Sequence, residues 1–300
     1  MARILVLGAA AMDIIVRVPD FAKTDSIIYP EEIHRVPGGS AANVAVGLAR
    51  LGAEVSFLGT SGADEDGDAI LAAFASENVD TGNFIRHAGV HTAGAFVAVN
   101  PSGDRIMYSL GGEALYADAS DLDPIDFSAD ALYIAEAFPA VGTEAARRVH
   151  ENGGRVFFSP GGVMCAYGLD TVRPIIAVCD TMFVSLSELE ALTGRRNAKF
   201  GADALLQCGA PAVVVTEGGR GAGIYTQNGF AFERSLPVKV VDTTGAGDAF
   251  AAAYLFAELS GHSPEERLRF ANRCAAFAVG RFGARTSPRL SELPDVEYYL

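Results

Sequence analysis

The 300-residue chain has no tryptophan, four cysteines and only three lysines among its 23 basic residues. The cysteines stand far apart and form no CxxC pair, and the five histidines show no HxxxH or HExxH spacing. These absences exclude a zinc ribbon, a redox dithiol and a metalloprotease-type metal site. Isolated cysteines of this kind are typical of small buried side chains in a reducing compartment.

Positive charge and long apolar runs are also missing. The net charge is −14, which argues against nucleic acid or an anionic membrane as a partner, since both attract basic surfaces. No apolar run approaches the ~18–20 residues of a membrane span, and the first residues lead directly into a strand pattern without a signal-peptide layout. We expect a cytoplasmic protein.

Two nucleotide-binding motifs are absent. The chain has no GxxxxGK[ST] sequence, so a P-loop is excluded, and the turn after the first apolar run reads Gly8–Asp13 rather than GxGxxG. A dinucleotide-dependent oxidoreductase is therefore not expected. The negative net charge does not exclude a nucleotide bound in another way, because a local anion hole and Mg²⁺ can override it.

The residues that are present predict an α/β fold. Half of them are hydrophobic, and short apolar runs alternate with helical patterns. Nearly continuous apolar strands separated by helices predict a doubly wound, mainly parallel sheet within one domain spanning residues 1–300. The expected strands are Arg3–Gly8, Val55–Gly59, Ala131–Ala135, Val156–Ser159, Met182–Ser185 and Val213–Thr216. The expected helices are Ser40–Leu51, Asp66–Asn78, Val141–Asn152, Ala202–Cys208 and Ala249–Leu259.

Two segments, 14–36 and 91–110, break this pattern because their residues alternate like strands, with a turn expected at Asn100–Gly103. They predict a small second sheet inserted into the main domain. Such a sheet could cover a site as a lid or pair with another subunit. An extra edge hairpin without function is the alternative.

The most informative stretch is Asp242–Phe250, which reads DTTGAGDAF. It follows an apolar run, Val238–Val241, expected to be a strand, and opens a helical pattern. The free N–H groups of a helix start can bind an anion, and Gly245, Ala246 and Gly247 let that anion approach closely. Asp248 adds a proton acceptor beside the hole, as phosphoryl transfer to a hydroxyl requires. The alternative is a tightly packed helix start.

A second motif, Gly38-Gly39-Ser40-Ala41-Ala42-Asn43, also opens a helical pattern. Its double glycine lets a ligand touch the main chain, and Asn43 offers both a donor and an acceptor. Together with Asp13, which follows the first strand, it suits a ligand with several hydroxyls. Helix capping by Ser40 and Asn43 is the alternative.

Weaker signals follow two later strands. The glycine-rich turn Thr216–Gly221 could hold a nucleotide, although such turns are common. Ser185 is followed three residues later by Glu188, whose carboxylate at a helix start could hold a metal–phosphate group through water. Taken alone, Glu188 is better explained as a complement to the helix dipole.

These motifs, in this order and spacing along essentially the whole chain, resemble the ribokinase-like (pfkB) carbohydrate kinase family. The resemblance implies a ribokinase-like sheet with a β lid, and ATP- and Mg²⁺-dependent phosphorylation of a sugar or nucleoside hydroxyl. It implies Asp248 as the general base and the amides of residues 245–247 as the anion hole. The acceptor would be held by Asp13, Gly38, Gly39, Asn43 and, more loosely aligned, Glu136.

The resemblance also implies the remaining sites. The nucleotide would lie at Ser185, Thr216, Gly218, Gly221 and Asn272, and Glu188 would be linked to Mg²⁺ through water. A monovalent cation, K⁺ in many members, would lie at Asp242, Thr244, Gly283 and Ser287. The lid often mediates dimerisation in this family, so a homodimer is expected.

The chain departs from the family pattern at three places. Ser185 replaces the asparagine of an Asn-x-x-Glu motif, and Ala11 replaces an asparagine that contacts the sugar ring in ribokinases proper, which makes ribose itself doubtful. Ser159–Gly162 resembles the Asp-Pro-Gly turn of some members, with serine for aspartate. A nucleoside kinase, with an aromatic or apolar slot made by Phe96, Met107 or Tyr108, and a binding protein without turnover are the alternatives.

Overall fold

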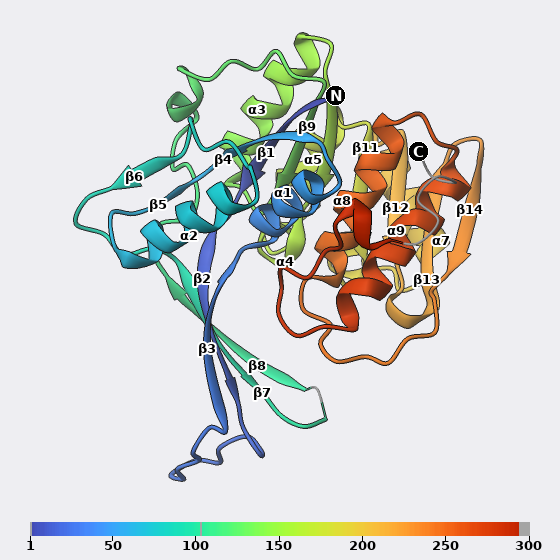
Figure 1. The fold of residues 1–300 in the computed structure, drawn as a ribbon. Helices are drawn as coiled ribbons and strands as arrows, with labels where there is room; N and C mark the ends of the chain where they lie inside the picture. The colour runs from blue at the N-terminus through green and yellow to red at the C-terminus, as the bar shows by residue number, and fades with distance from the viewer. Residues whose placement is uncertain (1, 103, 294–300) are drawn as a thin grey trace.

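The apolar runs form the strands of one large sheet (Figure 1). The computed structural model describes residues 2–102 and 104–293, and within them this sheet has eight strands in the order β14-β13-β12-β11-β10-β9-β1-β4. Neighbours from β4 to β12 pair in parallel, and β13 and β14 add an antiparallel edge. The strands are β1 (Arg3–Gly8), β4 (Glu54–Leu58), β9 (Ala131–Ala135), β10 (Arg155–Ser159), β11 (Thr181–Ser185), β12 (Ala212–Thr216), β13 (Gly221–Thr226) and β14 (Gly229–Arg234).

Helices cover both faces of this sheet because successive side chains of a strand point to opposite sides. In β1, Ile4 and Val6 join one buried cluster, and Leu5 and Leu7 join the other. The first cluster packs under α1 (Ser40–Arg50), α2 (Glu65–Ser76), α8 (Ala246–Leu259) and α9 (Pro264–Val279). The second packs under α3 (Pro139–Glu151), α4 (Gly161–Cys165), α5 (Leu169–Ile176), α6 (Leu186–Thr193) and α7 (Ala198–Gln207).

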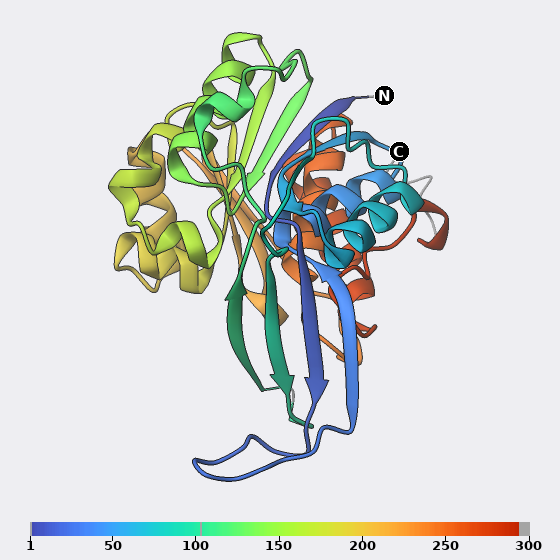
Figure 2. The same cartoon turned by 90° about the vertical axis from the view of Figure 1, so that its left-hand side faces the viewer.

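The alternating segments form a second sheet that extends from the main body (Figure 2). Its order is β3-β2-β7-β8, built from β2 (Ala11–Arg17), β3 (Glu32–Gly38), β7 (Gly94–Val99) and β8 (Arg105–Gly111). The predicted lid is therefore present, and residue 103 of the expected turn lies outside the described residues. Short elements complete the described chain: β5 (Thr60–Gly62), β6 (Ile85–His87) and the 3₁₀ turns Ala119–Leu122, Gly218–Arg220 and Leu290–Glu292.

One predicted strand is wrong. The run before the DTTGAGD motif, Val238–Val241, has no partner strand and carries exposed valines. Alternation of apolar residues marks a strand only where one face is buried, and here both faces stay open. Among the described residues, no helix is long and apolar enough to cross a membrane.

Candidate functional site

The two glycine-containing motifs meet at the carboxyl ends of the parallel strands, where open α/β sheets bind ligands. A cavity of about 190 Å³ lies there between α1, β9, α4, β11, α6, β12 and α8. Residues from widely separated parts of the sequence line it, namely Ser40, Tyr133, Glu136, Ser159, Gly161, Gly162, Phe183, Val184, Ser185, Glu188, Thr216, Gly247, Asp248, Phe250 and Ala251. The structure thus brings the predicted base together with residues of both predicted nucleotide motifs.

The start of α8 is narrow at Gly245 and open at Gly247. Gly245 is the N-cap at φ 74°, and a Cβ placed on it would lie 2.0 Å from the Ala284 carbonyl oxygen, so only glycine fits. A Cβ on Gly247 would meet nothing within 4 Å, which leaves open space above that peptide. Within the described residues no acceptor pairs with the N–H groups of Gly245 or Gly247. The Ala246 N–H, in contrast, donates to Thr243 O at 3.3 Å.

Asp248 is held by two side chains of α1. The Ser40 hydroxyl donates to Oδ1 at 2.7 Å, and the Asn43 amide donates to Oδ2 at 2.8 Å. Burial raises the pKa of Asp248 to about 6, against the lowering effect of these two hydrogen bonds, and nearby Glu188 raises it further. A carboxylate with a pKa near 6 is ionised at neutral pH yet basic enough to accept a proton.

These contacts decide against the capping interpretation of Ser40 and Asn43. The N-cap of α1 is Gly39, and no side chain caps this helix. Both polar side chains point instead across to α8. Ser40 is a residue whose importance sequence reasoning missed, because a serine at a helix start is an ordinary capping signal.

Asp13 of β2 lies close to Gly38, the last residue of β3. Asp13 accepts a hydrogen bond from the Ala95 N–H at 3.1 Å, and burial raises its pKa. A Cβ on Gly38 would lie 2.1 Å from the Asp13 carboxylate, and a Cβ on Gly39 would lie 2.4 Å from the Ala9 carbonyl oxygen. Gly38 therefore leaves room for the Asp13 carboxylate, and Gly39, at φ 90°, lets the start of α1 approach the backbone of Ala9.

Glu136 lies at the end of β9 in a left-handed backbone conformation, φ 53°, which is uncommon outside glycine. Burial raises its pKa to about 7, and the charges of Asp248, Glu188 and Asp13 add to the effect. The carboxyl groups of Glu136, Glu188 and Asp248 thus line one cleft, and their mutual repulsion adds to the effect of burial.

Glu188 does have the capping role that the sequence left open. Its carboxylate accepts from the Ser185 N–H at 2.7 Å, and the Glu188 N–H donates to the Ser185 hydroxyl at 3.3 Å. Ser185, at the position where the family pattern has asparagine, is thus the N-cap of α6 and forms a capping box with Glu188. Glu188 still lines the cleft, so capping and a role toward a ligand are compatible.

The other expected nucleotide residues come from β12, the turn that follows it and α9. Thr216 ends β12 and lines the cleft, whereas Gly218, which begins the next 3₁₀ turn, and Gly221, which follows that turn, are not among the lining residues. Asn272 on α9 is buried, and its amide donates to the carbonyl oxygens of Glu233 and Arg234 at 3.0 and 3.3 Å. In this structure Asn272 joins α9 to β14.

The expected cation residues are brought together only in part. The Asp242 carboxylate accepts from the Thr244 N–H at 2.9 Å and from the Gly283 N–H at 3.0 Å, which joins the two loops. Ser287 lies beside Gly47 of α1, and none of the described contacts joins it to Asp242. Among the described residues there is no cluster of three or more acidic, histidine or cysteine ligands.

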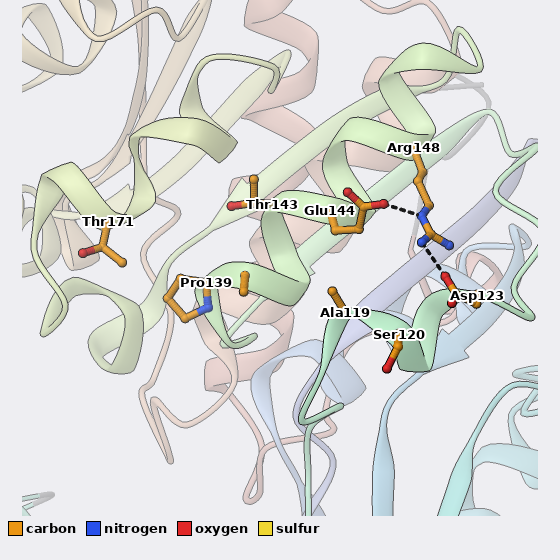
Figure 3. Close-up of a pocket in the computed structure, with 9 residues that line it drawn as sticks. Ala119, Ser120, Asp123, Pro139, Thr143, Glu144, Arg148 and Thr171 are labelled. Atoms are coloured by element: carbon orange, nitrogen blue, oxygen red, sulfur yellow. Dashed lines mark hydrogen bonds and ion pairs between the residues drawn. The ribbon is translucent and has the colours of Figure 1, made fainter.

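A second hollow, of about 620 Å³, opens on the surface beside α3 (Figure 3). Its charged groups are already paired with one another: Glu144 and Asp123 both accept hydrogen bonds from Arg148. It contains none of the residues that the motifs identified, so the chemistry belongs to the cleft at α8.

The comparisons with known proteins agree with this geometry. The sequence model of the pfkB family carbohydrate kinases matches residues 1–290. The chain is 32% identical to the ATP-dependent ribose-1-phosphate kinase of Halopiger xanaduensis over 96% of this chain and 95% of that protein. It is 28% identical to a nucleoside kinase of Methanothermobacter thermautotrophicus over 95% of this chain and 91% of that protein.

Solved structures with the same fold include two ribokinases. The structure resembles that of the Thermotoga maritima ribokinase with a TM-score of 0.85 and 28% identity, covering 100% of this chain and 99% of that one. It resembles the Arabidopsis thaliana ribokinase, which was solved with ribose and ATP, with a TM-score of 0.85 and 25% identity over 97% and 96% of the two chains.

Proposed function

Because the chain belongs to the pfkB family of carbohydrate kinases and is an ATP-dependent kinase of sugars or nucleosides, we propose that it phosphorylates a primary alcohol of a small sugar or sugar-like acceptor. The observation that carries this proposal is Asp248, half-buried and hydrogen-bonded to α1, at the mouth of the glycine-lined start of α8. Asp248 is the general base that removes the proton of the attacking hydroxyl.

The start of α8 receives the moving phosphoryl group. The N–H groups of Gly245 and Gly247 face it, with the positive end of the helix dipole behind them. The Ala246 N–H also donates to the phosphoryl group. It can leave its hydrogen bond to the Thr243 carbonyl oxygen because that bond is long, at 3.3 Å. The nucleotide lies along Ser185, Thr216, Gly218 and Gly221, with Asn272 at the outer end.

Mg²⁺ fits this site only as a partner of the nucleotide phosphates. Glu188 and Glu136 offer two carboxylates, too few for an all-protein magnesium cage, and Mg²⁺ commonly keeps several waters beside one or two carboxylates and the phosphates. Bound there, the ion neutralises charge on the phosphates. The carboxylate of Glu188, oriented by its bond to the Ser185 N–H, would face the ion through water.

The lid sheet has two faces: an inner face toward the main body and an outer face away from it. Asp13, Arg17 and Met107 point toward the main body: Arg17 lies over the ring of Phe282, and Arg105 on the same face donates to the Thr244 hydroxyl at 3.2 Å. By alternation and pairing, Phe96 and Tyr108 lie together on the other face.

The distribution of these side chains between the two lid faces favours a sugar acceptor. Of the three residues expected to form a nucleobase slot, only Met107 lies on the lid face toward the main body, so that face lacks the aromatic part of the slot. Asp13, Asn43 and Glu136 are polar groups suited to hydroxyls. The similarity to a nucleoside kinase keeps that function as the second candidate. Ala11 provides no amide for a sugar ring, which disfavours free ribose.

An acceptor panel tests the proposal. Release of ADP would be measured with ribose, ribose 1-phosphate, fructose, 2-keto-3-deoxygluconate, inositol, adenosine and cytidine, at fixed Mg²⁺ with and without K⁺. Turnover restricted to nucleosides would replace the sugar assignment by the second candidate. No turnover with any acceptor, together with intact ATP binding, would favour a binding protein.

We further propose three properties of the assembled enzyme. A monovalent cation binds near Asp242, Thr244 and Gly283, so K⁺ should raise the rate above that in Na⁺. The protein forms a homodimer through the outer lid face, where Ile33, Tyr108 and Leu110 are exposed. Its four unpaired cysteines and its use of ATP suit the cytoplasm. Sedimentation of wild type and Tyr108→Asp tests the dimer.

A further inference from the structure

Arg285, in the loop after α9, connects the motifs of the site. Its Nε donates to Asn43 Oδ1 at 3.2 Å, and its Nη2 donates to the Gly38 carbonyl oxygen at 3.1 Å. The Asn43 amide in turn donates from Nδ2 to Asp248 Oδ2 at 2.8 Å. A continuous path of hydrogen bonds therefore runs from the Arg285 guanidinium to the carboxylate of the base.

The direction of these bonds matters because an asparagine amide can be turned either way. A guanidinium has only donors, so the oxygen of Asn43 must face Arg285. The NH₂ group then necessarily faces Asp248, where it stabilises the ionised carboxylate. An ionised carboxylate has only acceptors, so Asp248 favours the same orientation, and Arg285 holds the amide from its oxygen end.

Arg285 is itself fixed on several sides. The residue before it, Ala284, packs its carbonyl oxygen against Gly245, and Gly283 is tied to Asp242. The guanidinium lies 5.3 Å from the centre of the Phe74 ring, and its Nη1 is buried without a hydrogen-bond partner among the described residues. A buried cation with an unpaired donor is costly, so a residue that only filled space here would be better replaced by an apolar one.

We propose that Arg285 is a positioning residue: it sets the orientation of the Asn43 amide and, through it, holds the Asp248 carboxylate ready to accept the proton. This inference rests on the proposed role of Asp248 as the base. Arg285 is not among the residues that line the cleft. It also places a positive charge near Asp13, so it supports both the acceptor side and the base side of the cleft.

The test compares Arg285→Met, which keeps an unbranched side chain but removes the donors, with Arg285→Lys, which keeps a charge and a donor. Arg289→Met is the matched control, since Arg289 lies in the same segment but pairs with Glu77 and not with Asn43. We expect Arg285→Met to lower kcat about tenfold to a hundredfold, the loss for one hydrogen bond to a charged group. KM for ATP should stay unchanged, Arg285→Lys should recover part of kcat, and the control should match wild type.

A merely structural role would not move the pH profile. Loss of the oriented Asn43 donor should shift the acid limb of kcat upward by roughly half a pH unit or more. The other groups facing Asp248 are Ser40 on α1, Glu188 on α6, and Glu136 and Tyr133 at β9, and the substitution leaves all of them in place.

A double-mutant cycle with Asn43→Ala tests whether Arg285 acts through Asn43. The cycle compares the loss of rate caused by Arg285→Met in two backgrounds, so it does not require either variant to be as stable as wild type. In the Asn43→Ala background the further change Arg285→Met should cost less than threefold, because the path is already broken. Equal losses in both backgrounds, or an unchanged acid limb in Arg285→Met, would overturn the inference. Asp248→Asn is run in parallel: a wild-type rate there would overturn the proposed function instead.

Discussion

The hydrogen bond from Ser40 to Asp248 offers a test whose size depends on pH. Ser40→Ala removes the donor at 2.7 Å from Oδ1 and leaves the Asn43 donor and the backbone of α1 intact. A hydrogen bond to the charged form lowers a carboxyl pKa, so its loss should raise the pKa of Asp248 above its present value of about 6. We take the rise to be about one unit, the lower part of the range for a bond to a charged group.

This rise fixes the expected rates. The base must be ionised, so kcat follows the ionised fraction of Asp248. At pH 6 that fraction falls from about one half to about one tenth, a roughly fivefold loss, whereas at pH 8.5 both enzymes are almost fully ionised and their rates should agree within about twofold. The assay is kcat at saturating ATP and acceptor from pH 5 to pH 9.

The control is Ser76→Ala on α2, where the hydroxyl donates only to the Ala73 carbonyl oxygen. Its profile should overlay that of wild type. A loss in Ser40→Ala that is the same at every pH would refute the reasoning, since it would mean that Ser40 acts on something other than the ionisation of Asp248.

Four further outcomes follow from the site. Asp248→Asn should keep the fold and ATP binding while lowering kcat by roughly 10²- to 10⁴-fold, the usual contribution of a general base, as single-turnover assays and ATP titration would show. Burial raises the pKa of Glu136 to about 7, so its protonated form stabilises the fold below pH 4.5 and this contribution is lost as pH rises through about 7. Glu136→Gln should therefore melt at a higher temperature than wild type at pH 8. The difference should be smaller at pH 5. Gly245→Ala should lower the melting temperature clearly, since its Cβ would strike the Ala284 carbonyl. Gly247→Ala should melt like wild type but bind ATP more weakly in calorimetry, because its Cβ enters the open space above the helix start.

Local sequence determined most of the fold and the main parts of the site. Nearly every residue of β1, β9 and β12 is apolar, and such continuous apolar runs are typical of strands buried on both faces of a parallel sheet. The glycines of the DTTGAGD motif and Gly38-Gly39 mark places where backbone must approach backbone or ligand closely. Those signals lie within a few residues of one another, so they can be read without knowing what packs against them.

The tertiary structure decided what depends on distant neighbours. Whether Val238–Val241 is a strand depended on the presence of a partner, and none is there. Whether Ser40 and Asn43 cap a helix or hold a base depended on α8, more than 200 residues away in sequence. The same holds for Arg285, because hydrogen bonds reach only about 3 Å and the partners that give an arginine its role are fixed only when the chain folds.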